Sequence, residues 1–482
     1  MKFRLQDLQF HVLPMRTRFP FRYGIASLTS LPHLFVRAVL EVDGREVRGV
    51  TSEGLAPKWF TKHADTTPEQ DLAEMLAVIQ NAARIAENAA SGPVGFFSWW
   101  KDLYEEQASW ARVRNQPPLL ANLGVSLMEK AVLDGLCKAS GLPLHRLLQS
   151  DLLQIELGAV HGGLSGLAPR QVLAPEPLQR VALRHTIGLA DPLSDEESPG
   201  LDDGLPDTLA ASIRAYGLRY FKIKVCGDAA VDIPRLRIIT KVLTAGCPEG
   251  FKATLDGNEQ FTDLQAFREF YATLQADRSL APLFNSLLLI EQPLYRDHAL
   301  KDDVAPVLAG WQDGPGMIID ESDGSLADLP RALDLGYSGT SFKACKGIMK
   351  GLVNAALLKV RASSMSRPPI QSGEDLAGVG PICVLQDLAM VAALGITHVE
   401  RNGHHYFRGL SMYPPEFQED VLRAHPGYYC RHGLGFPALE IHGGQLNLDS
   451  INAAPFGSAI PAQPEQFMPL KAWIMSGGMS QL

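Results

Sequence analysis

Two lysines two positions apart, Lys222 and Lys224, interrupt a stretch of apolar and β-branched residues at 218–225. The composition of this stretch predicts a β-strand, in which side chains two apart point to the same face. Both lysines therefore share one side of the strand, and in a barrel one of the two sides is the interior. Burying an unpaired ammonium group is very costly, so an interior position requires carboxylates close by.

Carboxylates follow in order along the chain. Three later apolar runs end in Asp256, Glu291 and Asp320, and a fourth ends in Lys343. Starting from Lys222, the successive spacings are 34, 35, 29 and 23 residues, close to the roughly 30 residues that a strand–helix–strand unit needs. Each polar residue lies at the carboxyl end of its run, where barrels of parallel strands carry their chemistry.

Strand and helix patterns alternate from residue 181 to residue 400 and give eight strands. Such alternation predicts a parallel sheet, and eight units predict that the sheet closes. We therefore expect an α/β fold with a (β/α)8-type barrel, a modified TIM barrel, beside an α+β module. The expected divisions are an α+β module at 1–150, an inserted connection at 151–180, the barrel at 181–408 and a segment at 409–482 that returns to the first module.

Residues 191–207 hold seven acidic side chains among prolines and glycines. This composition is typical of a mobile loop. The loop follows the first barrel strand, so two interpretations stay open. We favour a solvated linker, and the alternative is a lid over the active face.

The composition excludes several classes of protein. The chain has 482 residues, 46% of them hydrophobic and 20% charged, as in a soluble globular protein. Its net charge of −9 disfavours a nucleic-acid partner. Six scattered cysteines without a CxxC pair suit reduced thiols in a cytoplasmic protein. We expect no signal peptide and no membrane span, because the start lacks an apolar core and no run of about 18 apolar residues occurs.

The three strand-end carboxylates Asp256, Glu291 and Asp320 offer only oxygen ligands, which favours a hard cation, Mg²⁺ or Mn²⁺ in its place. A cation there offsets the repulsion between the acids. It also neutralises a substrate carboxylate, so that the proton on the neighbouring carbon is easier to remove. Lys224 and Lys343, on the second and sixth strands, are expected on opposite sides of the metal. A lysine acts as a base when its pKa is depressed, and we expect neighbouring cations to depress it.

Five motifs carry a resemblance to known enzymes. They are Lys222-Ile223-Lys224, Asp256-Gly257-Asn258, Glu291-Gln292-Pro293, Asp320-Glu321-Ser322 and Lys343-Ala344-Cys345-Lys346-Gly347. They look like motifs of the enolase superfamily, and most resemble the muconate-lactonizing-enzyme subgroup of the mandelate racemase/muconate lactonizing enzyme family. Segments 123–135 and 143–148 are similar to the end of that family's amino-terminal capping domain.

The resemblance implies a role for each matching residue. Asp256, Glu291 and Asp320 would bind Mg²⁺. Lys224 and Lys343 would be the two acid/base catalysts.

The resemblance extends to supporting groups. Lys222 would contact the substrate carboxylate, and Asn258 and Glu321 would orient the ligands of the metal. Glu374 loosely matches an acid that many members have after the seventh strand. Lys346 and His161 are interpreted as bystanders.

Substrate contacts in this family come from two loops of the capping domain, which match 19–23 and 53–60 here. Their candidate contacts are Arg22, Lys58 and Trp59, for an anionic or aromatic substrate end, with surface or packing roles as the alternative. On the eighth strand, Glu400 is a further candidate. The sequence Glu400-Arg401-Asn402 departs from the Asp-x-Asp that marks dipeptide specificity, which argues against dipeptides.

These observations favour an Mg²⁺-dependent isomerase, a racemase or epimerase or else a cycloisomerase, acting on a small carboxylate substrate and forming a homo-oligomer. The runner-up is a lyase of the o-succinylbenzoate synthase or acid dehydratase type. From other classes, a noncatalytic acid-binding barrel and a Schiff-base aldolase stay open.

Overall fold

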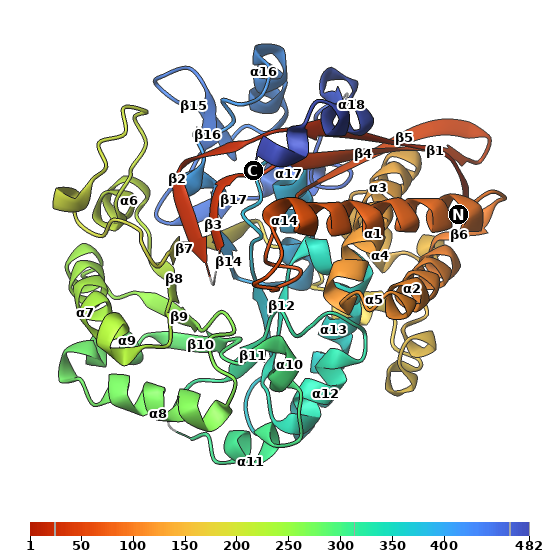
Figure 1. Ribbon diagram of the computed structural model, residues 1–482. Coiled ribbons are helices and arrows are strands. Elements are labelled where there is room, and N and C mark those ends of the chain that lie inside the picture. The colour runs from red at the N-terminus through yellow and green to blue at the C-terminus, as the bar shows by residue number, and fades with distance from the viewer. Residues whose placement is uncertain (24–25, 313, 462–463, 482) are drawn as a thin grey trace.

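The computed structural model of the chain describes residues 1–23, 26–312, 314–461 and 464–481. It consists of a closed barrel of parallel strands below an antiparallel sheet with its helices (Figure 1). The predicted fold class is confirmed. Within the described residues no helix has the length and apolar character to cross a membrane, and all six cysteines are free.

The barrel has eight parallel strands, and the last pairs with the first. The strands are β7 (Arg180–Ile187), β8 (Tyr220–Lys224), β9 (Lys252–Asp256), β10 (Leu287–Glu291), β11 (Met317–Ile319), β12 (Gly339–Phe342), β13 (Ile370–Gly373) and β14 (His398–Arg401). A ninth strand, β17 (Gln445–Asn447), pairs antiparallel with β7 on its amino-terminal half.

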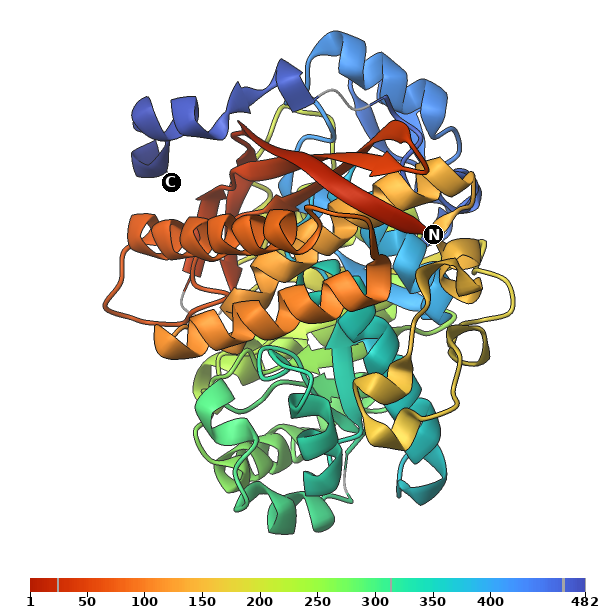
Figure 2. The ribbon, with the colours of Figure 1, turned by 90° about the vertical axis from the view of Figure 1, so that its right-hand side faces the viewer.

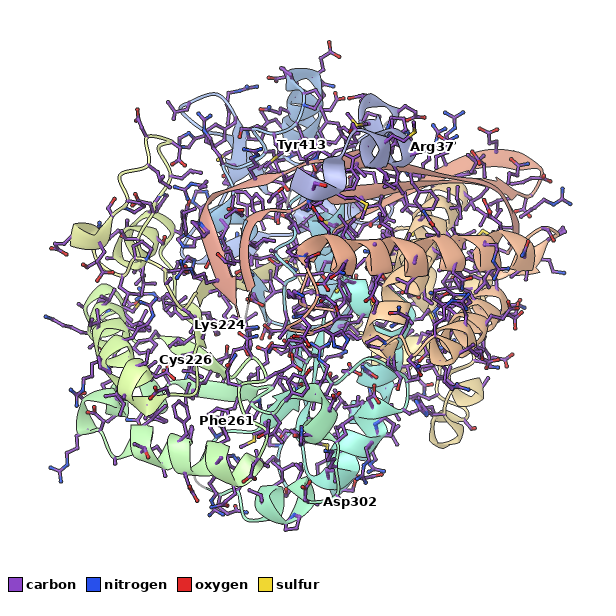
Figure 3. All side chains as sticks on the ribbon, in the orientation of Figure 1. Arg37, Lys224, Cys226, Phe261, Asp302 and Tyr413 are labelled. Atoms are coloured by element: carbon purple, nitrogen blue, oxygen red, sulfur yellow. The ribbon has the colours of Figure 1, made fainter. Side chains whose placement is uncertain are left out.

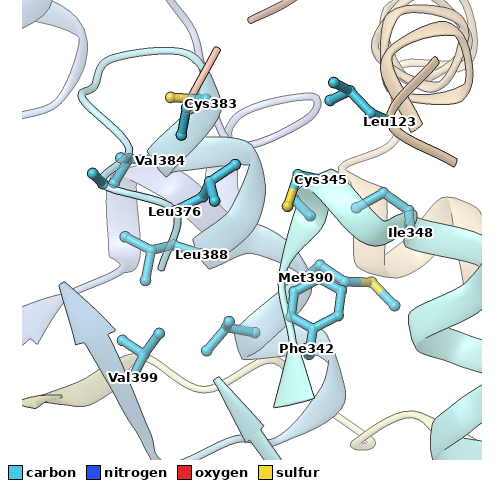
Figure 4. Close-up of a cluster of buried hydrophobic side chains, with 14 of the residues drawn as sticks. Leu123, Phe342, Cys345, Ile348, Leu376, Cys383, Val384, Leu388, Met390 and Val399 are labelled. Atoms are coloured by element: carbon cyan, nitrogen blue, oxygen red, sulfur yellow. The ribbon is translucent and has the colours of Figure 1, made fainter. Parts of the chain in front are cut away.

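Helices surround the strands on the outside (Figure 1). The longer ones are α6 (Leu209–Tyr216), α7 (Ala229–Gly246), α8 (Leu264–Gln275), α12 (Asp328–Leu335), α13 (Ile348–Arg361) and α14 (Cys383–Leu394). Apolar side chains fill the space between the two layers. Figure 4 shows part of this packing, with Phe342 of β12 and Met390 of α14 among its buried side chains. Both side chains are almost fully buried.

We call the antiparallel sheet above the barrel, together with its helices, the cap. Its sheet has the strand order β18-β1-β4-β5, with β6 paired to β1. Its strands are β1 (Lys2–Leu13), β4 (His33–Val42), β5 (Arg45–Gly54), β6 (Val94–Gly95) and β18 (Met468–Pro469). Three helices, α1 (Pro68–Ala89), α2 (Phe96–Val113) and α3 (Pro118–Ser140), lie on the side of the sheet that faces the barrel (Figure 2). Thr67 and Gln70 begin α1 with a capping box, which satisfies its free backbone N–H groups.

A separate hairpin, β2 (Arg16–Tyr23) with β3 (Ala26–Ser30), forms its own two-stranded sheet. It reaches down from the cap toward the mouth of the barrel (Figure 1). This hairpin carries the first of the two loops that the sequence suggested as substrate contacts.

Two connecting segments have more regular structure or more contacts than their composition suggested. The segment before β7, interpreted as an insertion without clear period, contains three 3-10 turns and a short helix, α5 (Pro169–Val172). Residues 191–207, for which we predicted a mobile loop, are bound to the rest of the molecule. Asp203 forms an ion pair with Arg18 of β2, and Asp191 accepts a hydrogen bond of 2.6 Å from Tyr406. The composition could not reveal these contacts, because the partners lie about 200 residues away in sequence.

The cap is joined to the barrel by a buried carboxyl group. Glu129 of α3 is 0% exposed and accepts a hydrogen bond from the backbone N–H of Ile348, at the start of α13. Burial raises the pKa of Glu129 to about 8, although the helix N–H groups oppose this shift. The side chain therefore keeps its proton at neutral pH in the folded protein.

We expect Glu129→Gln to change how stability depends on pH. Between pH 4.5 and about 8 the folded state holds a proton that the unfolded state has lost. Native stability therefore falls by about 1.4 kcal/mol per pH unit from this group as pH rises through that window. The amide has no such dependence, so the variant gains relative to the native protein toward pH 8. Urea unfolding at several pH values measures this gain. Glu106→Gln, on an exposed position of α2, is the control; a gain that stays constant with pH would contradict the assignment.

Candidate active site

Three site residues are aligned by strand register. Lys224 pairs with Asp256, and Asp256 pairs with Glu291, across β8, β9 and β10. Paired residues of parallel strands point to the same face, so the three side chains form a row at the carboxyl end of the barrel. Figure 3 shows Lys224 in the middle of the molecule, between the barrel and the β2–β3 hairpin, and Asp302 at the periphery.

The centre of the site is the ammonium group of Lys222, which is 1% exposed. Its side chain starts two residues before Lys224 and reaches up into the row. Four carboxylates lie within ion-pair distance of Nζ: Asp256 at 3.0 Å, Glu291 at 2.7 Å, Glu374 at 2.9 Å and Glu400 at 3.1 Å. Carboxylates from strand ends far apart in sequence thus contact one ammonium group.

A second cluster surrounds Asp320, just after β11. Its carboxylate lies 2.7 Å from Lys343 Nζ and 2.9 Å from Lys346 Nζ, and it accepts a hydrogen bond from Ser341. Lys346 also donates to the backbone carbonyl of Asp320 at 2.6 Å. We interpreted Lys346 as a bystander, and the structure shows that the turn after β12 brings it into contact with Asp320.

Lys224 and Lys343 lie on opposite sides of the barrel, because three strands separate β8 from β12 in either direction around the closed sheet. Lys224 contacts Asp256 at 2.5 Å. Lys343 contacts Asp320, and its Nζ lies 4.3 Å from the ring centroid of Trp59, a cation–π distance. Both lysines line the same cavity.

The pKa of Lys343 differs from our expectation. Burial alone would lower the pKa of Lys343, but the Asp320 carboxylate raises it above its ordinary value. Burial would likewise lower the pKa of Lys222, but the four surrounding carboxylates outweigh burial and raise this pKa well above its ordinary value. Lys222 lowers the pKa of Lys343, as we expected of a neighbouring cation, but the contact with Asp320 outweighs it.

The donor set matches a hard cation in chemistry. Asp256, Glu291 and Asp320 are buried oxygen donors on adjacent strand ends, and Asn258 Oδ1 is a buried oxygen beside the same cavity with no hydrogen-bond partner. Burial, then the charges of Asp256 and Glu374, raise the pKa of Glu291 well above its usual range, which marks an excess of negative charge. As the side chains stand, however, no three His, Cys, Asp or Glu groups of the described chain are arranged to hold an ion. Lysine ammonium groups contact these carboxylates instead: Lys222 contacts Asp256 and Glu291, and Lys343 contacts Asp320.

The cavity above the lysines is narrow. The space open to water-sized molecules is about 30 Å³, room for about two of them. Among the described residues the cap contributes only apolar side chains to its lining, Phe21, Ala56 and Trp59. Each of the three is at most 6% exposed. A ligand larger than this space requires the lining side chains of the cap to move, and its far end then meets an apolar ceiling formed by Phe21, Ala56 and Trp59.

Several predicted contacts lie elsewhere. Arg22 is exposed, and Lys58 turns to Asp71 at 3.0 Å and to the carbonyl of His63. Neither lines the cavity, whereas Trp59 does. Glu321 is buried against a different, larger groove that α2 and the loop 321–328 form.

The sequence did not single out some groups that the fold brings to the site. Asn402 and Asp375 line the cavity beside Glu400. Arg184 of β7 forms a fully buried ion pair with Glu374, and Thr186 donates to Glu400 at 2.5 Å. The alternation of β7 put Arg184 and Thr186 on the inner face, and this periodicity is the signal that could have found them.

Comparison with known proteins supports the fold. No protein-family model matches the chain, and no curated protein matches it in sequence. Solved structures match over nearly the whole chain, among them the following three. A mandelate racemase/muconate lactonizing protein from Herpetosiphon aurantiacus has a TM-score of 0.57 at 19% identity, covering 95% of this chain and 99% of its own.

The other two were solved with ligands. A dipeptide epimerase from Enterococcus faecalis V583, complexed with Mg and the dipeptide L-Leu-L-Tyr, gives a TM-score of 0.60 at 17% identity, covering 95% and 99% of the two chains. An enolase from Bradyrhizobium, complexed with magnesium and mandelic acid, gives 0.59 at 15% identity, covering 97% and 99%. This chain therefore has the fold of mandelate racemases and muconate lactonizing enzymes.

Proposed function

We propose that the protein is an Mg²⁺-dependent enzyme of the enolase superfamily that removes the proton next to a substrate carboxylate. The observation that carries this proposal is the pair Lys224 and Lys343, two buried amines on opposite sides of one cavity, each against a strand-end carboxylate. An ionic core that only stabilised a barrel would not need amines on both sides of a space at its mouth.

Asp256, Glu291 and Asp320 would hold the cation, exchanging their lysine partners for it. When bound, the cation supplies positive charge that stabilises negative charge on the substrate carboxylate. Mg²⁺ is the metal present with the dipeptide epimerase and the enolase of the same fold. Mn²⁺ is the alternative with the same oxygen chemistry.

The chain's own side chains divide the remaining work. Lys222, held among four carboxylates, stays charged and attracts the substrate carboxylate. Lys224 accepts or donates a proton on one face of the neighbouring carbon, and Lys343 does so on the other. Phe21 and Trp59 exclude water above the reacting atoms.

Two opposed lysines favour racemisation or epimerisation, in which one removes a proton and the other returns it to the opposite face. Cycloisomerisation begins with the same polarised carboxylate. Elimination in the manner of a lyase is the runner-up, because it needs only one of the two lysines as base.

The lining of the cavity favours a substrate with an apolar far end. The two lysines of the cap loop that carries Trp59 are taken by protein partners: Lys58 by Asp71, and Lys62 by Glu259 at 3.2 Å. A second carboxylate under Phe21 and Trp59 would be buried without a partner, which is costly. We propose a monocarboxylic acid whose remaining substituent is uncharged.

Metal binding is tested with Asp256→Asn. The native protein is expected to bind one Mg²⁺ in calorimetric titration, and the variant to bind it at least about tenfold more weakly, because one anionic ligand is lost. Asp302→Asn removes an acid that is 95% exposed and should leave the affinity unchanged. Native protein that takes up no Mg²⁺ would rule out the metal.

Proton abstraction is tested by exchange of deuterium from D₂O into both enantiomers of a panel of acids. Lys224→Ala should lose exchange with one enantiomer and Lys343→Ala with the other, each by about 10²–10⁴-fold, the usual contribution of a general base. Lys252→Ala, at the opposite end of the barrel, should exchange both enantiomers normally. Native rates of exchange with both enantiomers in either active-site variant would remove that lysine from the mechanism.

The apolar far end is tested with pairs of acids that differ by one distal carboxylate: butanoate and succinate, hexanoate and adipate, phenylacetate and 4-carboxyphenylacetate. In each pair that binds in the presence of Mg²⁺, the monoacid should bind at least about tenfold more tightly. Phe21→Arg should narrow this ratio by placing a cation in the ceiling, while Arg22→Ala, at an exposed neighbour, should preserve it. Tighter binding of the diacids by the native protein would refute the assignment.

A further inference from the structure

The β2–β3 hairpin holds Phe21 over the lysines, yet it is not part of the main sheet of the cap. Its position depends on contacts with the barrel side of the molecule. The ring of Phe21 lies 4.2 Å from the ring of Tyr406, measured between centroids, and Phe19 lies 4.9 Å from His405. Both partners belong to α15 (Gly403–Tyr406), the turn that follows the last barrel strand.

Arg18 adds a polar attachment to these ring contacts. Its side chain is only 3% exposed. The guanidinium group donates to both carboxylate oxygens of Asp203 and to three backbone carbonyls, those of Leu205 at 3.1 Å, Pro206 at 3.1 Å and His405 at 2.7 Å. All three guanidinium nitrogens of Arg18 thus donate to groups outside the cap. Four of the five hydrogen bonds end on the acidic loop, at Asp203, Leu205 and Pro206.

The acidic loop 191–207 is itself held at its base. The carboxylate of Asp191 accepts hydrogen bonds from the Gly188 N–H at 2.7 Å and from Tyr406 Oη at 2.6 Å. Arg235 of α7 donates to the carbonyls of Gly188 and Asp191. The loop is therefore a fixed support, and Tyr406 joins it to the ring contacts below Phe21.

We propose that the loop 191–207 positions the ceiling of the active site, with Arg18 as the positioning residue and Asp203 as its anchor. The cavity has room for about two water molecules, so a larger ligand fits only if the hairpin that carries Phe21 moves away and returns. The strength of this attachment therefore sets how often the site admits a ligand. Of the five bonds of Arg18, two end on a carboxylate, and charge-assisted bidentate pairs are the strong ones. The inference rests on the proposed function only for its catalytic consequence; the attachment itself is testable without a substrate.

The test is amide hydrogen exchange of the free protein carrying Asp203→Asn, which keeps size and removes charge. Exchange of the β2 amides within 16–23 should become about tenfold faster, because the open state gains what the ion pair had contributed to the closed one. Amides of α1 and β4 should not change. Asp202→Asn neutralises the exposed neighbouring acid and should leave exchange in β2 as in the native protein. Equal exchange in the two variants would overturn the proposal.

A second readout separates positioning from a general loss of structure. With an acid that the native protein turns over, Asp203→Asn should raise KM about tenfold and leave kcat within about twofold, since closure contributes to binding. Asp203→Glu should recover most of the native KM. A loss of kcat at constant KM would contradict the role of Asp203. If no acid is turned over, the hydrogen-exchange result still decides the attachment, and only the proposed function fails.

Discussion

One ammonium group organises the interior of the barrel. Lys222 lies within 3.1 Å of carboxylates from Asp256, Glu291, Glu374 and Glu400, and it is almost completely buried. Four acids without a central positive charge would repel one another in a medium of low polarity. The lysine therefore allows the strand ends to carry the acids at all, and it holds them at the spacing from which a divalent cation could take them over.

The sequence was sufficient for the parts of the site that follow a local period. Asp256, Glu291 and Asp320 could be placed because each ends an apolar run, and the spacing of the runs predicts successive barrel strands. Lys346 and the partners of Arg18 could not be placed in this way. Their positions depend on a turn and on a contact between segments about 185 residues apart, and no local pattern encodes either.

Charge was harder to predict than position. We expected neighbouring cations to depress the pKa of Lys343, but Asp320 in contact with it has the opposite effect. The sign depends on which neighbour is nearest, and side-chain contacts decide that. Lys58 gives a similar lesson: it belongs to the expected loop but turns to Asp71, and the adjacent Trp59 faces the cavity.

The outermost strand of the cap sheet, β18, pairs with β1 although some 450 residues separate them. A ribosome makes the chain from one end to the other, so all eight barrel strands emerge before the edge of β1 finds this partner. During synthesis the cap is thus an unfinished sheet beside a barrel that is already long enough to close. The cap sheet therefore gains its outermost strand only after the whole barrel sequence has been made.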